Sequence, residues 1–342
     1  MKTERLSINE IDKAGELIRK GELVAFPTET VYGLGADALN EEAVRSIYVA
    51  KGRPSDNPMI VHISDLFSLP ALIRDGKDGI SQDALDLMEA FWPGPLTLIF
   101  PKSEAIPDVT TGGLDTVAIR MPSNGIALEL IDAAGCPIAA PSANLSGKPS
   151  PTTAEDVLED MDGRISAVLM GEQSMVGIES TVVDLTAEIP TVLRPGRITA
   201  EKLSEVLGKQ VLYDQSLYTA PQQIADPEDG VADTGVAPKS PGMKYRHYSP
   251  NAKVRIIEGS DEEFTSIAVK LGTEARKEGR KVAVLNYGGN AIKAANRLFA
   301  DLRELDRQKY DLILIRSLEE VGFGFSVMNR MLKSAGYDIV KE

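Results

Sequence analysis

Hydrophobic positions along the chain follow two patterns that alternate over its first two-thirds. Short apolar runs predict β-strands, whereas apolar residues spaced three or four apart predict amphipathic helices. Ser7 and Glu10 form a capping-box pattern before one such helix, which Gly21 ends, and Asn40 can cap the next one. Strands are predicted at residues 23–26, 59–63, 96–100, 116–120, 137–140, 167–170, 180–185 and 191–194. This alternation predicts an α/β fold with one large twisted sheet, partly antiparallel.

The pattern breaks between Asp214 and Asp233 and then restarts. This stretch contains five acidic residues, no Lys or Arg, and too little apolar surface to pack, so it predicts a linker. Beyond it, strands at 254–257, 282–286 and 312–315 alternate with helices from about Asp261, from Asn290 and after Gly324. Strict alternation predicts a small Rossmann-like parallel α/β domain. We divide the chain into a first domain at 1–213, a linker at 214–250 and a second domain at 251–342.

Composition narrows the class of protein. A chain of 342 residues, 43% hydrophobic and 26% charged, can bury one large core or two ordinary ones. The net charge of −14 argues against broad binding to polyanions, so any nucleotide contact must be local. A single cysteine excludes an internal disulfide or a cysteine-based zinc site. With no apolar run long enough for a membrane span and no signal-peptide pattern, we expect a cytoplasmic protein.

Common catalytic motifs are missing from the sequence. The Gly-Lys pairs at Gly76, Gly147 and Gly208 are followed by Asp, Pro and Gln, so none makes a Walker loop. The sequence also lacks GxSxG and HExxH, and GFGF at 322–325 lacks the third glycine of a dinucleotide fingerprint. Two histidines leave little for histidine chemistry, and His62, within an apolar strand, is by default a packed or edge residue.

Instead, five polar features follow or interrupt the predicted strands and helices, where open α/β sheets bind ligands. They are PTETVYGLG at 27–35, KGRPSDNP at 51–58, Arg120 in an apolar strand, AAPSANLSGKPSPT at 139–152, and Glu179 to Thr181 with the turn at 193–197. Each also has a plain structural interpretation, as turn residues, helix-capping cations or a Ser/Pro loop. Together they supply cations and small donors that suit a phosphate group, with hardly any general base.

These segments, in this order, resemble the YrdC-type threonylcarbamoyl-AMP synthases. The quoted motifs GELVAFPTETVYGLGADA, KGRPSDNP, VAIRMP, APSANLSGKPSPT, GIESTVVD and LRPG carry the resemblance. SPGMKYRHYSP at 240–250, followed by a small α/β unit, resembles the longer version of the family with a C-terminal Rossmann-like domain. The resemblance implies a YrdC-like mixed sheet. It also implies an enzyme that makes threonylcarbamoyl-AMP and pyrophosphate from L-threonine, bicarbonate or carbon dioxide, and ATP with Mg²⁺. It implies no organic cofactor.

The resemblance also implies roles for individual residues. Catalytic and triphosphate-holding roles fall on Lys51, Arg53, Ser142 and Asn144, and further ATP contacts on Asn57, Ser150, Arg194 and Tyr245. Threonine contacts fall on Thr30, His62, Arg120, Ala140 and Ser180, with Arg120 pairing the threonine carboxylate, which reverses the default interpretation of His62. We further interpret Lys244, Tyr245, Arg246 and Tyr248 as a lid over the ATP site, against a solvated hinge as the alternative. The residues do not identify a protein ligand for the metal.

The implied product would pass to the machinery that modifies the adenosine next to the anticodon of certain tRNAs. A competing hypothesis is a non-catalytic RNA-binding module, which would bind mainly through phosphates and depend on salt. The acidic net charge opposes it, and we expect any contact of the free protein with tRNA to be weak. A third hypothesis, in which the second domain binds a nucleotide or partner as a regulatory unit, is compatible with the enzyme.

Overall fold

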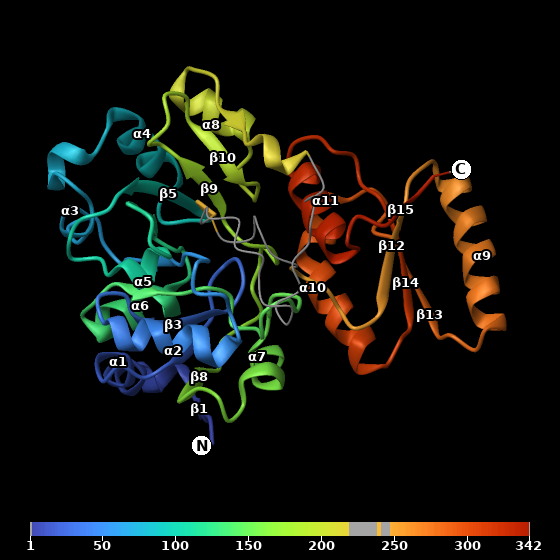
Figure 1. Ribbon diagram of the computed structural model, residues 1–342, viewed down its shortest axis with the longest axis horizontal. Coiled ribbons are helices and arrows are strands. Elements are labelled where there is room, and N and C mark those ends of the chain that lie inside the picture. Colours follow the sequence, from blue (N-terminus) through green and yellow to red (C-terminus); the bar gives the residue numbers. More distant parts are fainter. Residues whose placement is uncertain (1, 219–237, 241–246, 342) are drawn as a thin grey trace.

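Two sheets form two domains in the computed structural model, which describes residues 2–218, 238–240 and 247–341 (Figure 1). The larger sheet has eleven strands in the order β1-β8-β2-β3-β7-β4-β6-β5-β9-β10-β11. Their bounds are β1 Glu4–Leu6, β2 Val24–Phe26, β3 Gly33–Asp37, β4 Ile60–His62, β5 Leu96–Pro101, β6 Thr116–Arg120, β7 Ile138–Ala139, β8 Ala167–Leu169, β9 Thr181–Asp184, β10 Thr191–Arg194 and β11 Leu212–Tyr213. Parallel pairs such as β4 with β6 and antiparallel pairs such as β5 with β6 make this sheet mixed, which confirms the predicted fold class.

The helices of the larger domain pack on this sheet. They are α1 Ile11–Arg19, α2 Glu41–Lys51, α3 Leu69–Leu72, α4 Gln82–Phe91, α5 Asp108–Thr111, α6 Gly125–Ala134, α7 Ala154–Met161 and α8 Ala200–Leu207. The Ser7 and Glu10 capping box forms before α1, and the Asn40 side chain accepts from two backbone N–H groups at the start of α2. Both predicted helix starts are therefore confirmed.

The prediction for residues 27–35 needs a correction. Its last residues are not part of a polar connection, because β3 begins at Gly33 and pairs antiparallel with β2. The connection between these strands is therefore shorter than predicted, and its residues Thr28 to Val31 are buried. Because two of the five β3 residues are glycines, the strand has no clear hydrophobic pattern in the sequence.

The smaller domain has four strands and three helices among the described residues. They are β12 Lys253–Ile257, α9 Asp261–Lys277, β13 Val282–Leu285, α10 Ala291–Arg307, β14 Leu312–Arg316, α11 Phe323–Ser334 and β15 Ile339–Val340. All strand pairs in the order β13-β14-β12-β15 are parallel, which confirms the Rossmann-like prediction. The last helix begins at Phe323, so Gly324 lies within its first turn.

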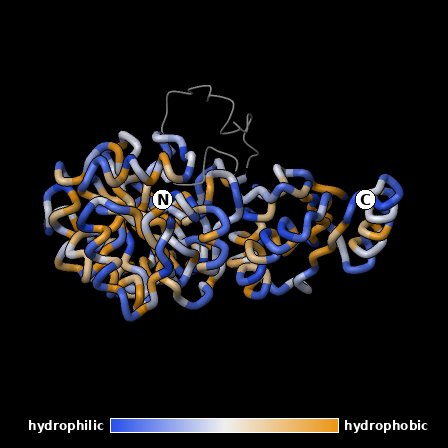
Figure 2. Tube along the Cα trace, turned by 90° about the horizontal axis from the view of Figure 1, so that it is seen from below, coloured by the Kyte–Doolittle hydropathy of each residue, from blue (hydrophilic) through white to orange (hydrophobic). Residues whose placement is uncertain are grey.

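Apolar residues gather inside both domains. Orange segments of the tube in Figure 2 mark hydrophobic residues along the chain. The main core of the larger domain lies between its sheet and helices such as α2, and a second cluster packs α1 against α6. In the smaller domain one cluster packs α10 and α11 on the sheet and another packs α9 on its other side. Val31 and Ile178 of the larger domain belong to the α10–α11 cluster, so the two domains share buried apolar surface.

The predicted linker falls mainly outside the described residues. The last strand of the large sheet ends at Tyr213, and the first strand of the small sheet begins at Lys253. Within the parts of the chain that the structure describes, every helix is too short or too polar to cross a membrane.

Candidate functional site

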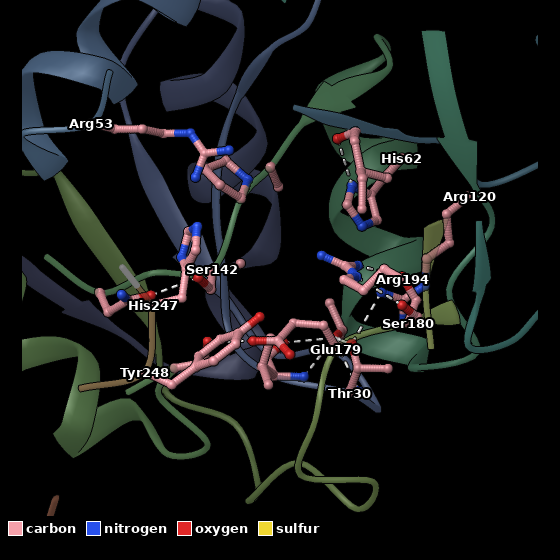
Figure 3. A pocket seen from close by; sticks show the side chains of 18 of the residues that line it. Thr30, Arg53, His62, Arg120, Ser142, Glu179, Ser180, Arg194, His247 and Tyr248 are labelled. Carbon is pink, nitrogen blue, oxygen red and sulfur yellow. Dashed lines mark hydrogen bonds between the residues drawn. The ribbon is translucent and has the colours of Figure 1, made fainter. Parts of the chain in front are cut away.

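A pocket opens at several strand ends of the large sheet, beside His247 and Tyr248 (Figure 3). It is lined by Thr28, Thr30, Val31, Gly33, Arg53, Ile60, His62, Arg120, Ala140, Pro141, Ser142, Asn144, Lys148, Ser150, Glu179, Ser180, Arg194, His247 and Tyr248. The central strands β3, β4, β6 and β7 are neighbours in the sheet, which is why residues from distant parts of the sequence line one cavity. All five polar features predicted from the sequence contribute to this lining.

One side of the pocket carries Arg53 and the loop after β7 (Figure 3). The Arg53 guanidinium donates to the backbone carbonyls of Asn57 and Pro58, so its own loop holds it in place. The Ser142 hydroxyl donates to the Asn144 side-chain oxygen at 2.6 Å, and the Asn144 amide donates to the carbonyls of its own loop. This side presents a guanidinium and small polar groups, which together suit an anion.

Lys51 supports this loop from behind. Its ammonium group donates to the carbonyls of Ser142 and Asn144, and its side chain is buried at the end of α2. Burial and the neighbouring Arg53 charge place the pKa of Lys51 well below its ordinary value. In this structure Lys51 is therefore directed at the backbone of the loop and not at the cavity.

The opposite side carries Thr30, His62, Arg120 and Ser180 (Figure 3). Arg120 is 3% exposed, donates to Thr30 at 3.0 Å and lies 2.7 Å from the Glu29 carboxylate. Its Nη2 therefore forms a buried ion pair with Glu29, although the contact does not meet hydrogen-bond geometry. A guanidinium is suited to a carboxylate ligand, and a ligand at this position would share Arg120 with Glu29.

His62 is buried in β4 and lines the same side. Its Nδ1 lies 3.2 Å from the Ile60 carbonyl, and its ring packs edge-on against Phe26. Burial, with a contribution from the Arg120 charge, lowers the pKa of His62 to about 3. The imidazole is therefore neutral at physiological pH, and its Nδ1 lies within hydrogen-bond distance of the Ile60 carbonyl.

Arg194 and Glu179 bring opposite charges to the floor of the pocket. Arg194, at the end of β10, donates to the Ser180 carbonyl and hydroxyl, both at 3.0 Å. Burial lowers the pKa of Arg194 to about 10, so it stays charged. Burial alone would raise the pKa of Glu179, but Arg330, Arg194 and the Ser150 hydroxyl hold it below its ordinary value. Both side chains are therefore ionised at neutral pH.

The structure places most of the predicted site residues together. The predicted residues that line the pocket are Thr30, Arg53, His62, Arg120, Ala140, Ser142, Asn144, Ser150, Ser180, Arg194 and Tyr248. Lys51 and Asn57 are buried behind the lining. Lys244, Tyr245 and Arg246 lie outside the described residues. The roles assigned to all of them stay predictions.

Sequence reasoning did not assign roles to three charged or titratable residues of the lining: Lys148, Glu179 and His247. Lys148 and Glu179 lie within quoted motifs, so membership of a motif was the available signal. His247 lies between the predicted lid residues Arg246 and Tyr248, so its place in that segment was the available signal. Among the described lining residues Glu179 is the single carboxylate, which sets it apart from the cations around it.

A protein-held metal does not fit the described residues. They contain no group of three or more His, Cys, Asp or Glu side chains able to hold an ion. The Glu179 carboxylate already accepts hydrogen bonds from Ser150 and Arg330. The pocket can therefore bind anions, orient them and exclude water, with its own cations supplying the positive charge.

Comparisons with known proteins match both domains. A family model described as telomere recombination, for the Sua5, YciO and YrdC proteins, matches residues 16–196. A second model, described as threonylcarbamoyl-AMP synthase, C-terminal domain, matches residues 198–336. The two matches together span nearly the whole chain.

Full-length relatives give the same result. The threonylcarbamoyl-AMP synthase of Pyrococcus abyssi is 45% identical, over 99% of this chain and 97% of its own. That of Bacillus subtilis is 44% identical, also over 99% of this chain and 97% of its own. Among solved structures, the crystal structure of P. abyssi Sua5 complexed with L-threonine superposes with a TM-score of 0.89 and 44% identity, covering 100% of both chains.

Proposed function

The chain belongs to the two-domain threonylcarbamoyl-AMP synthase family and is an enzyme of the nucleotidyl- or carbamoyl-transferring type, and on this premise we propose its reaction. It converts L-threonine, bicarbonate or carbon dioxide, and ATP into threonylcarbamoyl-AMP and pyrophosphate. The product then serves the threonylcarbamoyladenosine modification of tRNA next to the anticodon.

The observation that carries this proposal is the division of one pocket into two polar sides. Arg53 and Ser142 face the cavity from one side, and His62, Arg120 and Ser180 from the other (Figure 3). Asn144, which also lines the pocket, is hydrogen-bonded to Ser142. The first side suits the phosphates of ATP, and the second suits an amino acid whose carboxylate pairs with Arg120. Arg194 and Ser150 line the same pocket, and we assign them to ATP as well.

The chemistry we propose needs no protein nucleophile. The amine of threonine adds to carbon dioxide and loses a proton, which gives a carbamate. A carbamate oxygen then attacks the α-phosphorus of ATP, and pyrophosphate leaves as the bond to its bridging oxygen breaks. The chain's task is to align the two substrates and to neutralise charge on the phosphates, which positioned guanidinium groups and hydroxyls can do.

In this proposal magnesium enters the pocket bound to ATP and is not held there beforehand by the described residues. Because the described residues form no metal-holding group and Glu179 is already paired, we expect Mg²⁺ to arrive with the ATP phosphates. The residues assigned to ATP then supply cations and small donors to its phosphates, and the described residues contain no dedicated ligand set for the ion.

The test is pyrophosphate release from ATP by the purified full chain. We expect release that requires both threonine and bicarbonate, with other amino acids inactive. Release without threonine, or no release under any condition, would contradict the proposal. Binding of tRNA without turnover would favour the RNA-binding hypothesis instead, and its dependence on salt would report how many phosphates are contacted.

A further inference from the structure

An arginine of α11, in the smaller domain, contacts Glu179 of the pocket lining. The Arg330 side chain is fully buried, although it belongs to a different domain from most of the residues that it contacts. Its Nε donates to the Glu179 carboxylate at 3.0 Å, and its Nη1 donates to the Pro195 carbonyl at 2.6 Å. One planar guanidinium therefore joins α11 to two separate loops of the catalytic domain.

The first of these contacts leads to the ATP side of the pocket. Glu179 is 6% exposed, and its other carboxylate oxygen accepts from the Ser150 hydroxyl at 2.6 Å. Ser150 lines the pocket and is assigned to ATP in the proposed function. Glu179 also precedes Ser180, which is assigned to threonine (Figure 3). Fixing the Glu179 carboxylate thus constrains residues assigned to both substrates.

The second contact leads to Arg194. Pro195 and Gly196 follow Arg194 directly, and their carbonyls accept from Arg330 and from the Ser326 hydroxyl, at 2.6 and 2.8 Å. Two side chains one turn apart on α11 therefore hold the turn that ends β10. This anchoring fixes the base of the Arg194 side chain, whose guanidinium donates to Ser180.

We propose that Arg330 is a positioning residue of the active site, which sets Glu179 with Ser150 and the Arg194 turn in place from the C-terminal domain. This rests on the proposed function. It gives the smaller domain a part in catalysis: α11 closes a charge network that the catalytic domain leaves incomplete. Removing the guanidinium would leave the Glu179 carboxylate buried with its main cation missing.

The variants that test this are Arg330→Met, Glu179→Gln and the double variant, with Arg307→Met as the matched control. Arg307 also joins the two domains, to Asp156 and Glu159, but it is 41% exposed and does not line the pocket. For each full-length variant we would measure the melting temperature, and kcat and KM for ATP and threonine in the pyrophosphate assay.

We expect Arg330→Met to lower kcat/KM by about 100-fold, the effect of a displacement near 1 Å in a substrate-holding group. Arg307→Met should keep kcat/KM at the wild-type level. In the double variant the buried pair is neutral, so the melting temperature should recover towards wild type. Activity should stay low, because the Ser150 and Pro195 contacts are no longer held by one rigid group.

Two outcomes would overturn the inference. In the first, Arg330→Met has a lower melting temperature but wild-type kcat/KM. In the second, the double variant regains activity together with stability. Either result would mean that Arg330 only stabilises the contact between the two domains. If Arg330→Met does not fold, Arg330→Lys replaces it. Lysine keeps the charge but cannot donate to Glu179 and Pro195 in the same fork, so we expect wild-type melting with a partial loss of kcat/KM. Full activity of Arg330→Lys would overturn the inference as well.

Failure of the proposed function gives a different result. In that case the wild type itself shows no threonine-dependent pyrophosphate release. Calorimetric titration with ATP alone then tests the positioning role, because Ser150 and the Arg194 turn are fixed before any chemistry. We expect weaker ATP binding by Arg330→Met than by Arg307→Met and wild type, and equal affinities in all three would contradict it.

Discussion

His62 makes the stability of the catalytic domain depend on pH in a way that can be calculated. Its pKa is about 3 in the folded protein against an ordinary value of 6.5, because the imidazole is buried and lies beside Arg120. Below pH 6.5 the unfolded chain takes up a proton that the folded chain does not bind, so stability is full above that pH and decreases as the pH falls towards 3. Between pH 7 and pH 5 this single group should lower the free energy of unfolding by about 2 kcal/mol.

The assay is urea unfolding at the two pH values, followed by tryptophan fluorescence. The chain has one tryptophan, and Trp92 is 8% exposed within the catalytic domain, so its emission reports on that domain. His62→Asn keeps a donor near the Ile60 carbonyl but cannot titrate. We expect this variant to lose about 2 kcal/mol less than wild type between pH 7 and pH 5.

The control is Asn40→Ala, which removes the α2 cap and contains no titrating group. It should be less stable at both pH values and lose as much as wild type between them. Equal losses in wild type and His62→Asn would refute the reasoning. So would an NMR titration in which the His62 ring, one of only two histidines, protonates near pH 6.5.

Three further changes have defined outcomes. Arg120→Lys should raise KM for threonine by roughly 10- to 100-fold with little change in KM for ATP, because a hydrogen bond to a charged group contributes about 1.5–3 kcal/mol. Pyrophosphate release at varied threonine concentration measures this KM, and an unchanged value would contradict the carboxylate assignment. Gly196→Ala places a Cβ 2.5 Å from the Thr181 nitrogen, so β9 must shift. We expect this variant to lose about 1–3 kcal/mol of stability and most of its activity, and a wild-type kcat/KM would contradict that expectation. Asn40→Ala should cost about 1 kcal/mol in urea unfolding while its activity stays at the wild-type level.

Much of the fold was predictable because its elements carry local signals. The strands Thr116–Arg120 and Thr191–Arg194 were predicted with the observed bounds, since each is a short apolar stretch with a Thr at its start and an Arg at its end. β3 was not predicted, because its glycines are selected by close packing: a Cβ on Gly35 would lie 2.9 Å from Ile138 and Phe26 atoms. The two-residue strands β11 and β15 depend on neighbours in the sheet rather than on their own pattern.

The candidate site divides in the same way. Arg53, Ser142 and Arg120 lie in segments that were predicted to bind a ligand, and the pocket brings them together. The pairing of Glu179 with Arg330 had no local signal, because 151 residues separate them in the sequence. Likewise, only three-dimensional packing shows that Lys51 faces carbonyls and that Arg120 lies against Glu29. Sequence motifs identified what lines the pocket, whereas the structure was needed to find what holds the lining in place.

The two sides of the small sheet differ in a way that matters for handling the protein. Helices α10 and α11 cover the side that meets the catalytic domain, whereas α9 covers the other side and faces away from it (Figure 1). Val269 and the polar residues around it on α9 are open to solvent. A fluorescent label or a surface tether attached through α9 would therefore leave the pocket untouched. The enzyme could be immobilised or tracked by that helix while it turns over.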